Sequence, residues 1–492
     1  MEENLSGQWQ QDLSALRRQL QPQVNFDILE RRLLIGGREA YFYHVTGFVS
    51  DDNVQRIIRF FLELEPEEIP EAPEGFLARD TAFGSVKLET AVDKLVTAVL
   101  SGLGVLLMEG YAAGLAFDIR NYPSRGVQEP DKDRVLRGSR DGFSETIIAN
   151  TALIRRRIRD PKLRLEIFQV GSASHTDIAL VYLEGRAEEK LLEKIRQRLK
   201  TVKVDALTMN QESLAECLYT HKWYNPFPKF KYTERPDTAA ACLLEGNLVI
   251  LVDNSPAAMV LPSSVFDIAE AADDYYFPPI TGTYLRITRI LTALVALFLI
   301  PVYLLLMQNT QWLPEALQFI RPVENVNVPL IYQILILELA VDGLRLASVN
   351  TPSMLSTPLS IIAGIVMGDF SVQSGWFNSE IMLYMAFVTV ANYTQTSYEL
   401  GYAIKFLRLI LVILTSLFNV WGFAAGLILI LLAVITNKTI AGTSYLYPLI
   451  PFRWREVKNR FFRSRLSHVY PGEERQPNSG GGGTQPPEGG RS

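Results

Sequence analysis

ILTALVALFLIPVYLLLM, residues 290–307, is a run of 18 residues without a charged side chain. At about 1.5 Å of rise per residue, a helix of this length reaches roughly 27 Å, about the thickness of the hydrocarbon core of a bilayer. Pro301 lies inside the run, and membrane helices tolerate an internal proline. We therefore predict that this segment spans a membrane and divides the chain into two unlike halves.

Further apolar segments follow this first span. The last of them, residues 404–436, is interrupted near Asn419–Gly422, so it is better interpreted as a helical hairpin than as a single crossing. The two short arms either cross the bilayer with local thinning or dip into it and return. The spans predicted within a membrane domain at 290–436 are 290–307, 328–345, 353–372, 380–396 and the hairpin at 404–436.

Basic residues beside these segments predict the orientation of the chain, because loops rich in Lys and Arg stay in the cytoplasm. Arg286 and Arg289 precede the first span, and Lys405 and Arg408 return the chain to the same side. RWREVKNRFFRSR at 453–465 carries six basic residues and one acidic residue. We therefore expect both termini in the cytoplasm and an even number of crossings.

The half before the membrane alternates strand-like and helix-like patches, which favours mixed α/β layers. The expected fold class is an α/β soluble N-terminal region of two subdomains followed by an all-α polytopic membrane domain. Outside the membrane domain we expect a polar N-terminal arm at 1–24, cytoplasmic α/β subdomains at 25–119 and 144–276, a charged connector at 120–143, a juxtamembrane linker at 277–289, a basic cytoplasmic segment at 437–470 and a disordered tail at 471–492.

Composition argues against several classes of function. The net charge of −5 comes without a pooled basic stripe, so nucleic acid is not an expected partner. Cys217 and Cys242 are the two cysteines, too few for a disulfide framework. The four histidines lack metal-ligand spacing, and there is no phosphate-binding loop, GxSxG motif or catalytic triad. We expect no cofactor, no metal and no enzymatic activity.

Three charged residues interrupt the second apolar segment, and two of them, Glu338 and Asp342, are candidates for a pore or gate. Glu338 and Asp342 are four residues apart, and Arg345 is three further on, so they share one helix face. A charge at bilayer depth costs at least ~2.5 kcal/mol and rarely faces lipid. Glu338 and Asp342 either form a cation-attracting or gating ring at an oligomer axis, or Glu338 pairs with another polar helix while Asp342 and Arg345 sit at the interface.

Small residues form a stripe along the third apolar segment. The residues in this stripe are Ser353, Thr357, Ser360, Gly364 and Gly368. Such a stripe either packs helices closely or lines a polar pore. In a symmetric oligomer, a central stripe can serve both purposes.

Several strings resemble one family, the GerA-type spore germination A subunits. They are RNYPSRGVQEPDKDRVLRGSRDGFSE (120–145), VGSASHTDIALVYLEG (170–185), NPFPKFKYTERPD (225–237), EGNLVILVDNSPAAMVLP (245–262) and DDYYFPPITGTYLRITRI (273–290). With the membrane half they cover nearly all of residues 25–465. Within the family, NYTQTSYELGYAIKFLRLILVILTSLFNVWGF and NKTIAGTSYLYPLIPF are most similar to the stage V sporulation protein AF type.

This resemblance implies a protein of the inner membrane of bacterial endospores. It further implies that copies assemble into a homo-oligomer, a pentamer in this family, that conducts monovalent cations during germination. The stage V type is expected to amplify the germination signal together with a small membrane partner subunit and other germination proteins. Nutrient recognition in the family is assigned to a separate subunit, so this chain need not bind a nutrient.

The charged connector is the strongest fingerprint of the family. We interpret it as an ion-paired clamp between domains or subunits. The candidate clamp residues are Arg125, Glu129, Arg134, Arg137, Arg140 and Asp141. The leading functional hypothesis is an oligomeric cation channel, and the alternative is a non-conducting scaffold or signal-relay subunit that organises other germination proteins.

Overall fold

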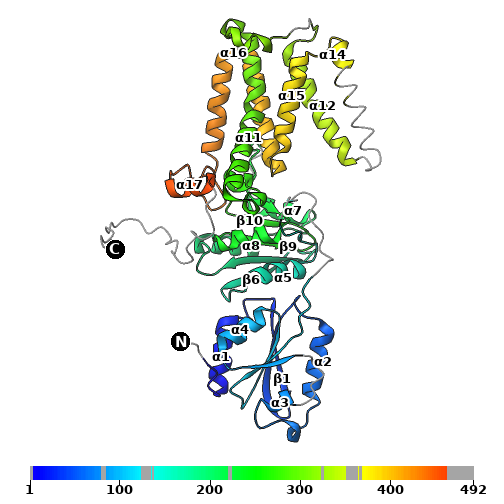
Figure 1. The fold of residues 1–492 in the computed structure, drawn as a ribbon, viewed down its shortest axis with the longest axis vertical. Helices are drawn as coiled ribbons and strands as arrows, with labels where there is room; N and C mark the ends of the chain where they lie inside the picture. Colours follow the sequence, from blue (N-terminus) through cyan, green and yellow to red (C-terminus); the bar gives the residue numbers. More distant parts are fainter. Residues whose placement is uncertain are drawn as a thin grey trace, which may run out of the picture.

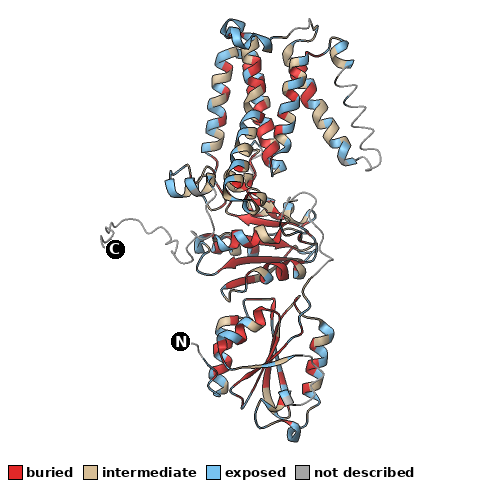
Figure 2. Ribbon diagram, viewed as in Figure 1, coloured by how far each residue is buried: buried red, intermediate tan, exposed pale blue. Residues whose placement is uncertain are grey.

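Two α/β units and a group of long helices follow one another along the long axis of the molecule (Figure 1). The computed structural model describes residues 4–78, 85–123, 135, 138–219, 224–322, 326–350, 364, 368 and 370–462. The N-terminal region holds two antiparallel sheets and the C-terminal part is helical, which confirms the predicted fold class. Figure 2 shows buried residues concentrated in the two sheets, with many exposed positions along the long helices.

The first unit is a five-stranded antiparallel sheet with helices on both faces. Its elements are α1 Trp9–Leu20, β1 Ile28–Ile35, β2 Arg38–Val45, α2 Asp51–Leu62, η1 Pro66–Glu68, α3 Gly75–Ala78, β3 Val86–Glu89, α4 Val92–Leu100, β4 Gly104–Met108 and β5 Gly114–Phe117. The strand order is β1-β2-β4-β5-β3. Because side chains alternate along a strand, Tyr41 and Tyr43 of β2 pack with α1 and α4, whereas Phe42 packs with α2.

The segment 1–24, expected to be a polar arm, contains helix α1, which packs into the core of the first unit. Leu13, Leu16 and Leu20 are buried and recur at three- and four-residue spacing. They share a hydrophobic cluster with α4 and β2. This spacing defines one face of a helix, and it is the signal that the polar composition of the segment obscured.

His44 on β2 makes the stability of the first unit depend on pH. Burial lowers the pKa of its imidazole from 6.5 to about 4. The imidazole binds a proton near pH 6.5 in the unfolded chain but only near pH 4 in the folded chain. The free energy of unfolding is therefore highest above pH 6.5 and decreases as the pH falls towards 4. We expect the first unit to lose about 2 kcal/mol between pH 7 and pH 5, measured by hydrogen exchange in β1 and β2. An unchanged pH step in His44→Leu would contradict this assignment.

The second unit is also a five-stranded antiparallel sheet covered on both faces. Its elements are α5 Ile147–Arg157, β6 Leu163–Val170, β7 Thr176–Leu183, α6 Glu189–Thr201, α7 Asn210–Leu218, β8 Lys231–Thr233, α8 Pro236–Leu244, β9 Leu248–Val252 and β10 Ala258–Leu261. The strand order is β6-β7-β9-β10-β8. Helices α5 and α8 cover one face, and α6 and α7 cover the other.

The two units repeat one topology, which the sequence analysis did not predict. In both, a helix and a hairpin are followed by a helix, a strand, a helix and a second hairpin, and the strand orders correspond. Helices α4 and α8, strands β4 and β9, and strands β5 and β10 start 144 residues apart (92 against 236, 104 against 248, 114 against 258). Between the second helix and the next strand, the first unit has the short α3 and the second unit has the longer α7, and the second unit is the one that contacts the long helices.

A buried ion pair ties the first unit to the second. Arg155 of α5 donates from Nε and Nη2 to the Asp27 carboxylate at 2.8 and 2.9 Å, and the Arg155 side chain is 0% exposed. Beside it, the amide of Leu165 on β6 donates to Asn25 Oδ1 at 3.0 Å, and the amide of Phe26 donates to the Leu165 carbonyl at 3.2 Å. The segment before β1 is therefore bound to the edge of the second sheet.

The helical part begins after two short helices at the end of the second unit. Those are α9 Val265–Ala269 and α10 Asp273–Tyr276. The helical part comprises α11 Pro279–Gln308, η2 Thr310–Trp312, η3 Glu315–Ile320, α12 Leu330–Asn350, α14 Ser371–Gln373, α15 Ser379–Tyr393, α16 Tyr398–Ile435 and α17 Trp454–Phe461. Most of the expected span 353–372 lies outside the described residues. Helices α11 and α16 are long and apolar enough to cross a membrane.

Helix α16 is a hairpin that reverses at Asn419, within the stretch where the sequence analysis placed a turn. Asn419 has φ 53° and ψ −129°, which is not a helical conformation. A Cβ added to Gly422 would overlap the carbonyl oxygen of Leu414, so the two arms touch through their backbones. Asn419 and Asn309, at the end of α11, exchange two side-chain amide hydrogen bonds of 2.5 and 3.1 Å. The tip of the hairpin is therefore fixed to the far end of α11.

Candidate functional site

A charge cluster lies between α12 and the first arm of α16. We define it as Glu338, Asp342, Arg345, Lys405 and Arg408. The Glu338 carboxylate accepts a hydrogen bond from Arg408 Nε at 2.7 Å, and it lies 2.6 Å from Arg408 Nη2 and 3.2 Å from Lys405 Nζ. Lys405 also forms an ion pair with Asp342. Glu338, Lys405 and Arg408 are buried, so the cluster is an internal feature of one chain.

The spacing on the two helices explains why these charges meet. Glu338, Asp342 and Arg345 fall at intervals of four and three, and Lys405 and Arg408 at an interval of three, so each set occupies one helix face. At about 1.5 Å per residue, Arg408 lies roughly 15 Å from the start of α16, near the middle of its first arm. A buried charge without a partner is costly, so the opposite charges stabilise each other.

Arg408 also joins a third helix to the cluster. Its Nη1 donates to the carbonyl of Ala296 on α11 at 2.6 Å. Arg408 therefore bridges α11, α12 and α16.

Arg345 at the edge of the cluster is surrounded by aromatic rings. Its guanidinium carbon lies 5.5 Å from the ring centroid of Tyr393, 4.8 Å from that of Tyr398 and 4.9 Å from that of Tyr402. Cation–π contacts within about 6 Å stabilise a guanidinium. Arg345 therefore holds the end of α12 against α15 and the start of α16.

The cluster is closed within one chain. The space enclosed beside Glu338, Asp342, Lys405 and Arg408 is about 20 Å³, enough for about one water molecule. A space of this size does not hold a hydrated cation. Of the two sequence interpretations of Glu338, the pairing with Lys405 and Arg408 matches the one in which it pairs with another polar helix, and its gating role stays a prediction.

Lys405 and Arg408 were misinterpreted in the sequence analysis as loop charges. Both lie inside α16 and are buried against Glu338. They therefore give no independent support to the predicted orientation. The signal that could have found them is the matched three- and four-residue spacing of opposite charges in two apolar segments.

The small-residue stripe is described only at its end. Ser353, Thr357 and Ser360 lie outside the described residues. At Gly364 and Gly368, an added Cβ would meet no atom of the described chain within 4 Å. Within the described part of one copy, therefore, this end of the stripe does not pack closely against another helix.

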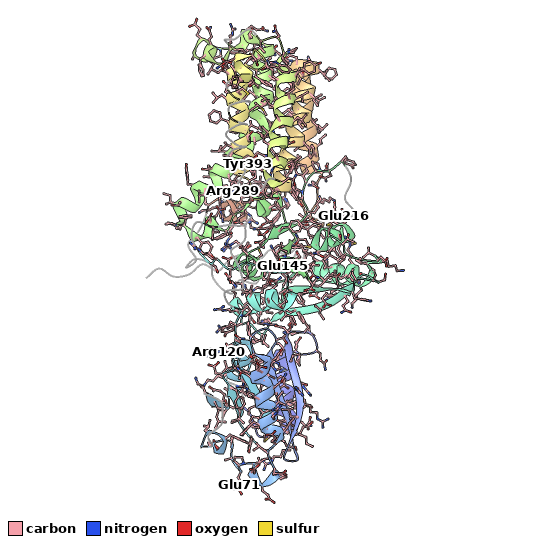
Figure 3. The ribbon with its side chains drawn as sticks, turned by 90° about the vertical axis from the view of Figure 1, so that its right-hand side faces the viewer. Glu71, Arg120, Glu145, Glu216, Arg289 and Tyr393 are labelled. Atoms are coloured by element: carbon pink, nitrogen blue, oxygen red, sulfur yellow. The ribbon has the colours of Figure 1, made fainter. Side chains whose placement is uncertain are left out.

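A second group of charges joins the second unit to the long helices, and we call it the junction network. It contains Asp267, Glu270, Asp274, Arg286, Arg289 and Arg460. Arg286 Nη2 lies 2.7 Å from Glu270, and Arg289 Nη1 lies 2.9 Å from the buried Asp274. Arg460 pairs with Asp267 and, at 3.1 Å, with Glu270. Figure 3 shows Arg289 where the second unit meets the helices.

The end of the α16 hairpin is also bound to the second unit. Asn225 Nδ2 donates to Asn437 Oδ1 at 3.1 Å, and Lys229 Nζ donates to the carbonyl of Lys438 at 2.8 Å. Lys194 Nζ on α6 donates to the carbonyl of Ile440 at 2.7 Å. The start of α11 and the segment after α16 are thus both bound to one α/β unit.

The charged connector is described only at its C-terminal end. Arg125, Glu129, Arg134 and Arg137 lie outside the described residues. Asp141 lies 2.5 Å from Arg157 of α5, and Arg140 is exposed. The described pair lies within the second unit, and a clamp between subunits stays a prediction.

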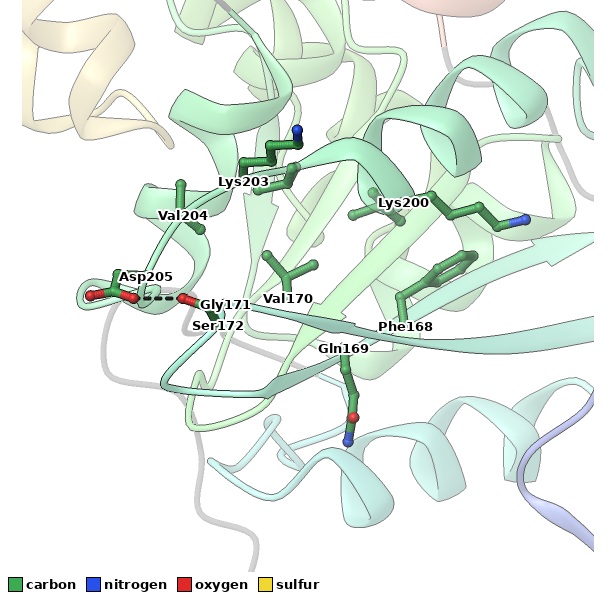
Figure 4. Close-up of a pocket in the computed structure, with 11 residues that line it drawn as sticks. Phe168, Gln169, Val170, Gly171, Ser172, Lys200, Lys203, Val204 and Asp205 are labelled. Carbon is green, nitrogen blue, oxygen red and sulfur yellow. Dashed lines mark hydrogen bonds between the residues drawn. The ribbon is translucent and has the colours of Figure 1, made fainter.

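Two other features of the second unit do not form a better site. A groove of about 610 Å³ runs beside the end of β6, with Lys200 and Lys203 on its rim and Asp205 bound to Ser172 (Figure 4). Burial raises the pKa of the Cys242 thiol to about 12, so it is not a reactive thiolate. Among the described residues, no group of three or more His, Cys, Asp or Glu side chains is arranged to hold a metal.

Comparison with known proteins places the chain in a family. A family model described as Bacillus/Clostridium GerA spore germination protein matches residues 14–472. The chain belongs to the GerA family. This GerA-family chain is 34% identical to stage V sporulation protein AF of Bacillus subtilis (strain 168) over 439 residues, which cover 88% of each chain. It is 32% identical to the uncharacterized membrane protein YfkQ of the same organism, covering 89% of this chain and 86% of that one.

A solved structure is also similar to the α/β region of this GerA-family protein. It is the crystal structure of the N-terminal domain of the A subunit of the Bacillus megaterium spore germinant receptor GerK3. The match has 25% sequence identity and a TM-score of 0.42, and covers 53% of this chain and 97% of that chain. The family confirms the predicted resemblance and a role in spore germination, and the two long apolar helices indicate association with a membrane.

Proposed function

We propose that the chain is a membrane subunit of a spore germination complex and that several copies form a cation channel in the spore inner membrane. Such a channel would release monovalent ions or amplify the germination signal. The observation that carries this proposal is the buried charge cluster between the long helices of a germination-family protein. Ionisable residues held among apolar helices are costly and typically mark ion pathways or gates.

In this proposal the charge cluster is a latch and not the conducting path. Two acidic residues, Glu338 and Asp342, face three basic ones, Arg345, Lys405 and Arg408, so the cluster does not attract cations. The path lies instead at an axis between copies, lined by the small-residue stripe of the third segment. Among the described residues, an added Cβ at Gly364 or Gly368 would meet no atom within 4 Å, which supports this arrangement.

The junction network gives the latch its input. A change in the second unit reaches α11 through Asp274 and Arg289, and reaches α16 through Asn437. Helix α11 contacts Arg408 through the Ala296 carbonyl, and helix α16 contains Arg408. We infer that the α/β units lie in the cytoplasm, and that a small membrane partner subunit or another germination protein acts on them.

Glu338→Gln in the full chain tests the latch. Loss of the carboxylate charge leaves Arg408 and Lys405 without their shared partner, so α12 is released more easily. We expect potassium efflux from loaded liposomes containing the variant to differ from wild type by about tenfold, as 1.4 kcal/mol on a gating equilibrium produces. Glu315→Gln, in the exposed η3 segment, is the matched control and should behave as wild type. Equal flux from Glu338→Gln and wild type at equal protein level would remove Glu338 from the account.

The alternative is a scaffold or signal relay that conducts nothing. One observation favours it: Glu338 and Arg408 satisfy each other within one copy, and the enclosed space holds about one water. Liposomes separate the two functions. Ion flux from the purified chain supports the channel, and absence of flux, both alone and with the partner subunit, supports the relay.

A further inference from the structure

The segment from Ile450 to Phe462 exposes several large apolar side chains next to the junction. Phe452 is 64% exposed, Trp454 67% and Phe462 53%, and Ile450 is exposed beside them. The rings of Phe452 and Trp454 lie 6.2 Å apart. Single exposed apolar residues are ordinary, but a contiguous group of aromatics usually marks an interaction surface.

The two faces of helix α17 have different roles. Val457 and Phe461 face the protein, and the ring of Phe461 lies 5.4 Å from that of Phe266 on α9. Arg460 on the same side enters the junction network. The outer face carries Trp454, Arg455 and Lys458, which are exposed, and Phe462 is exposed just after the end of the helix. Residues four apart share a helix face, so the aromatic Trp454 and the basic Lys458 lie together on one surface.

The helix lies at the level where a bilayer surface is expected. Figure 1 shows α17 lying sideways beside the point at which α11 leaves the second unit. Arg286 Nη1 on α11 donates to the Arg460 carbonyl at 3.0 Å, which fixes this position. The exposed aromatics are therefore held near the end of an apolar helix that is long enough to span a membrane.

The chemistry of the outer face selects one occupant. Trp and other aromatic side chains prefer the headgroup level of a bilayer, and Lys and Arg beside them bind anionic lipids. The nearby acid, Glu456, is turned to Arg453 at 3.2 Å and to Tyr447, so it does not oppose an anionic surface. We propose that α17 and the preceding Ile450–Arg453 segment form a membrane-surface anchor that binds anionic lipid headgroups of the leaflet facing the α/β units.

This anchor requires that α11 spans a membrane and does not depend on whether the complex conducts ions. Arg460 connects the anchor to the junction network, because it lies on α17 and pairs with Asp267 and Glu270. The anchor is thus a site at which the charge of the membrane affects the connection between the α/β units and the helices.

Spin labels on the full chain in lipid nanodiscs test the anchor. Cys217→Ser and Cys242→Ser provide the background, into which Trp454→Cys is introduced for labelling. Leu34→Cys, at a β1 position 65% exposed in the first unit, is the aqueous control, and Leu417→Cys, 69% exposed on α16, is the lipid control. We expect the label at 454 to be quenched by oxygen and shielded from a water-soluble nickel complex, as at 417 and opposite to 34.

Lipid charge is then varied to identify the headgroup chemistry. Nanodiscs of phosphatidylcholine alone are compared with nanodiscs containing phosphatidylglycerol. The measured quantity is the ratio of lipid-immersed to water-exposed populations of the label at 454. We expect phosphatidylglycerol to raise the ratio, and Arg455→Gln and Lys458→Gln each to lower it by about fivefold. A label that is water-accessible in both lipids, or shielded from both quenchers as in a protein interface, would overturn the proposal.

Discussion

Replacing Arg155 with leucine is expected to lower the stability of the α/β region by about 3–5 kcal/mol, because the Asp27 carboxylate remains buried without a partner. Both side chains are almost fully excluded from solvent, at 0% and 2% exposed. Hydrogen exchange at the amides of Phe26 and Leu165 measures the change, since both bonds lie beside the ion pair. These amides should exchange faster in the variant, before the core strands of either sheet do.

The same helix provides a matched control for Arg155. Arg157 pairs with Asp141, but these side chains are 21% and 27% exposed. A pair that keeps partial contact with water contributes less than a fully buried one, so Arg157→Leu should destabilise the region less than Arg155→Leu. The double variant Asp27→Leu with Arg155→Leu removes both charges and should recover much of the loss. Equal destabilisation by Arg155→Leu and Arg157→Leu would show that burial of the ion pair is not what joins the units.

The fold class followed from patterns that act over short distances. The uncharged run at 290–307 lies within a single helix, α11, and the alternation of strand-like and helix-like patches corresponds to the two sheets. The interruption near Asn419 coincides with the non-helical residue that reverses α16. In each case the residues that carry the signal also determine the local conformation.

The repeat of the two units was missed because the units share their topology but few identical residues. Val92–Leu100 and Pro236–Leu244 occupy equivalent helices, yet one begins with valine and the other with proline. Asp93 and Asp237 in the first turns, and Gly102 and Gly246 at positive φ after the helices, are among the few matches. A buried position requires an apolar side chain of suitable size and not a particular residue, so few identities survive.

The sequence predicted the acidic side of the charge cluster but not its basic partners. Glu338 was a candidate because a carboxylate in an apolar segment is costly wherever the segment packs. Its partners lie 67 and 70 residues away, on a helix whose arrangement depends on the hairpin at Asn419. Local spacing shows that a partner is needed, but only the packing of α11, α12 and α16 shows which residues provide it.

Replacing Gly422 with leucine is expected to prevent the α16 hairpin from closing. Any side chain at this position would overlap the carbonyl oxygen and carbon of Leu414, which are backbone atoms that a rotamer change cannot move. The cost should exceed the upper end of the about 1–3 kcal/mol typical of overpacked cores. An open hairpin separates Asn419 from Asn309 and misplaces Asn437 relative to the second unit. We expect loss of monodisperse full-length protein after detergent extraction, measured by size-exclusion chromatography at equal expression.

Gly343 on α12 is the control that separates steric overlap from loss of a helical glycine. A Cβ at Gly343 would meet no described atom within 4 Å, and alanine favours a helix over glycine by about 1 kcal/mol. Gly343→Ala should therefore be extracted as well as wild type, whereas Gly422→Ala should already be impaired, because even a methyl group overlaps Leu414. Normal extraction of Gly422→Leu would mean that the two arms of α16 are further apart than the backbone contact requires. In that case the charge cluster would lose its support, because Lys405 and Arg408 are positioned by the same arm that Gly422 packs against.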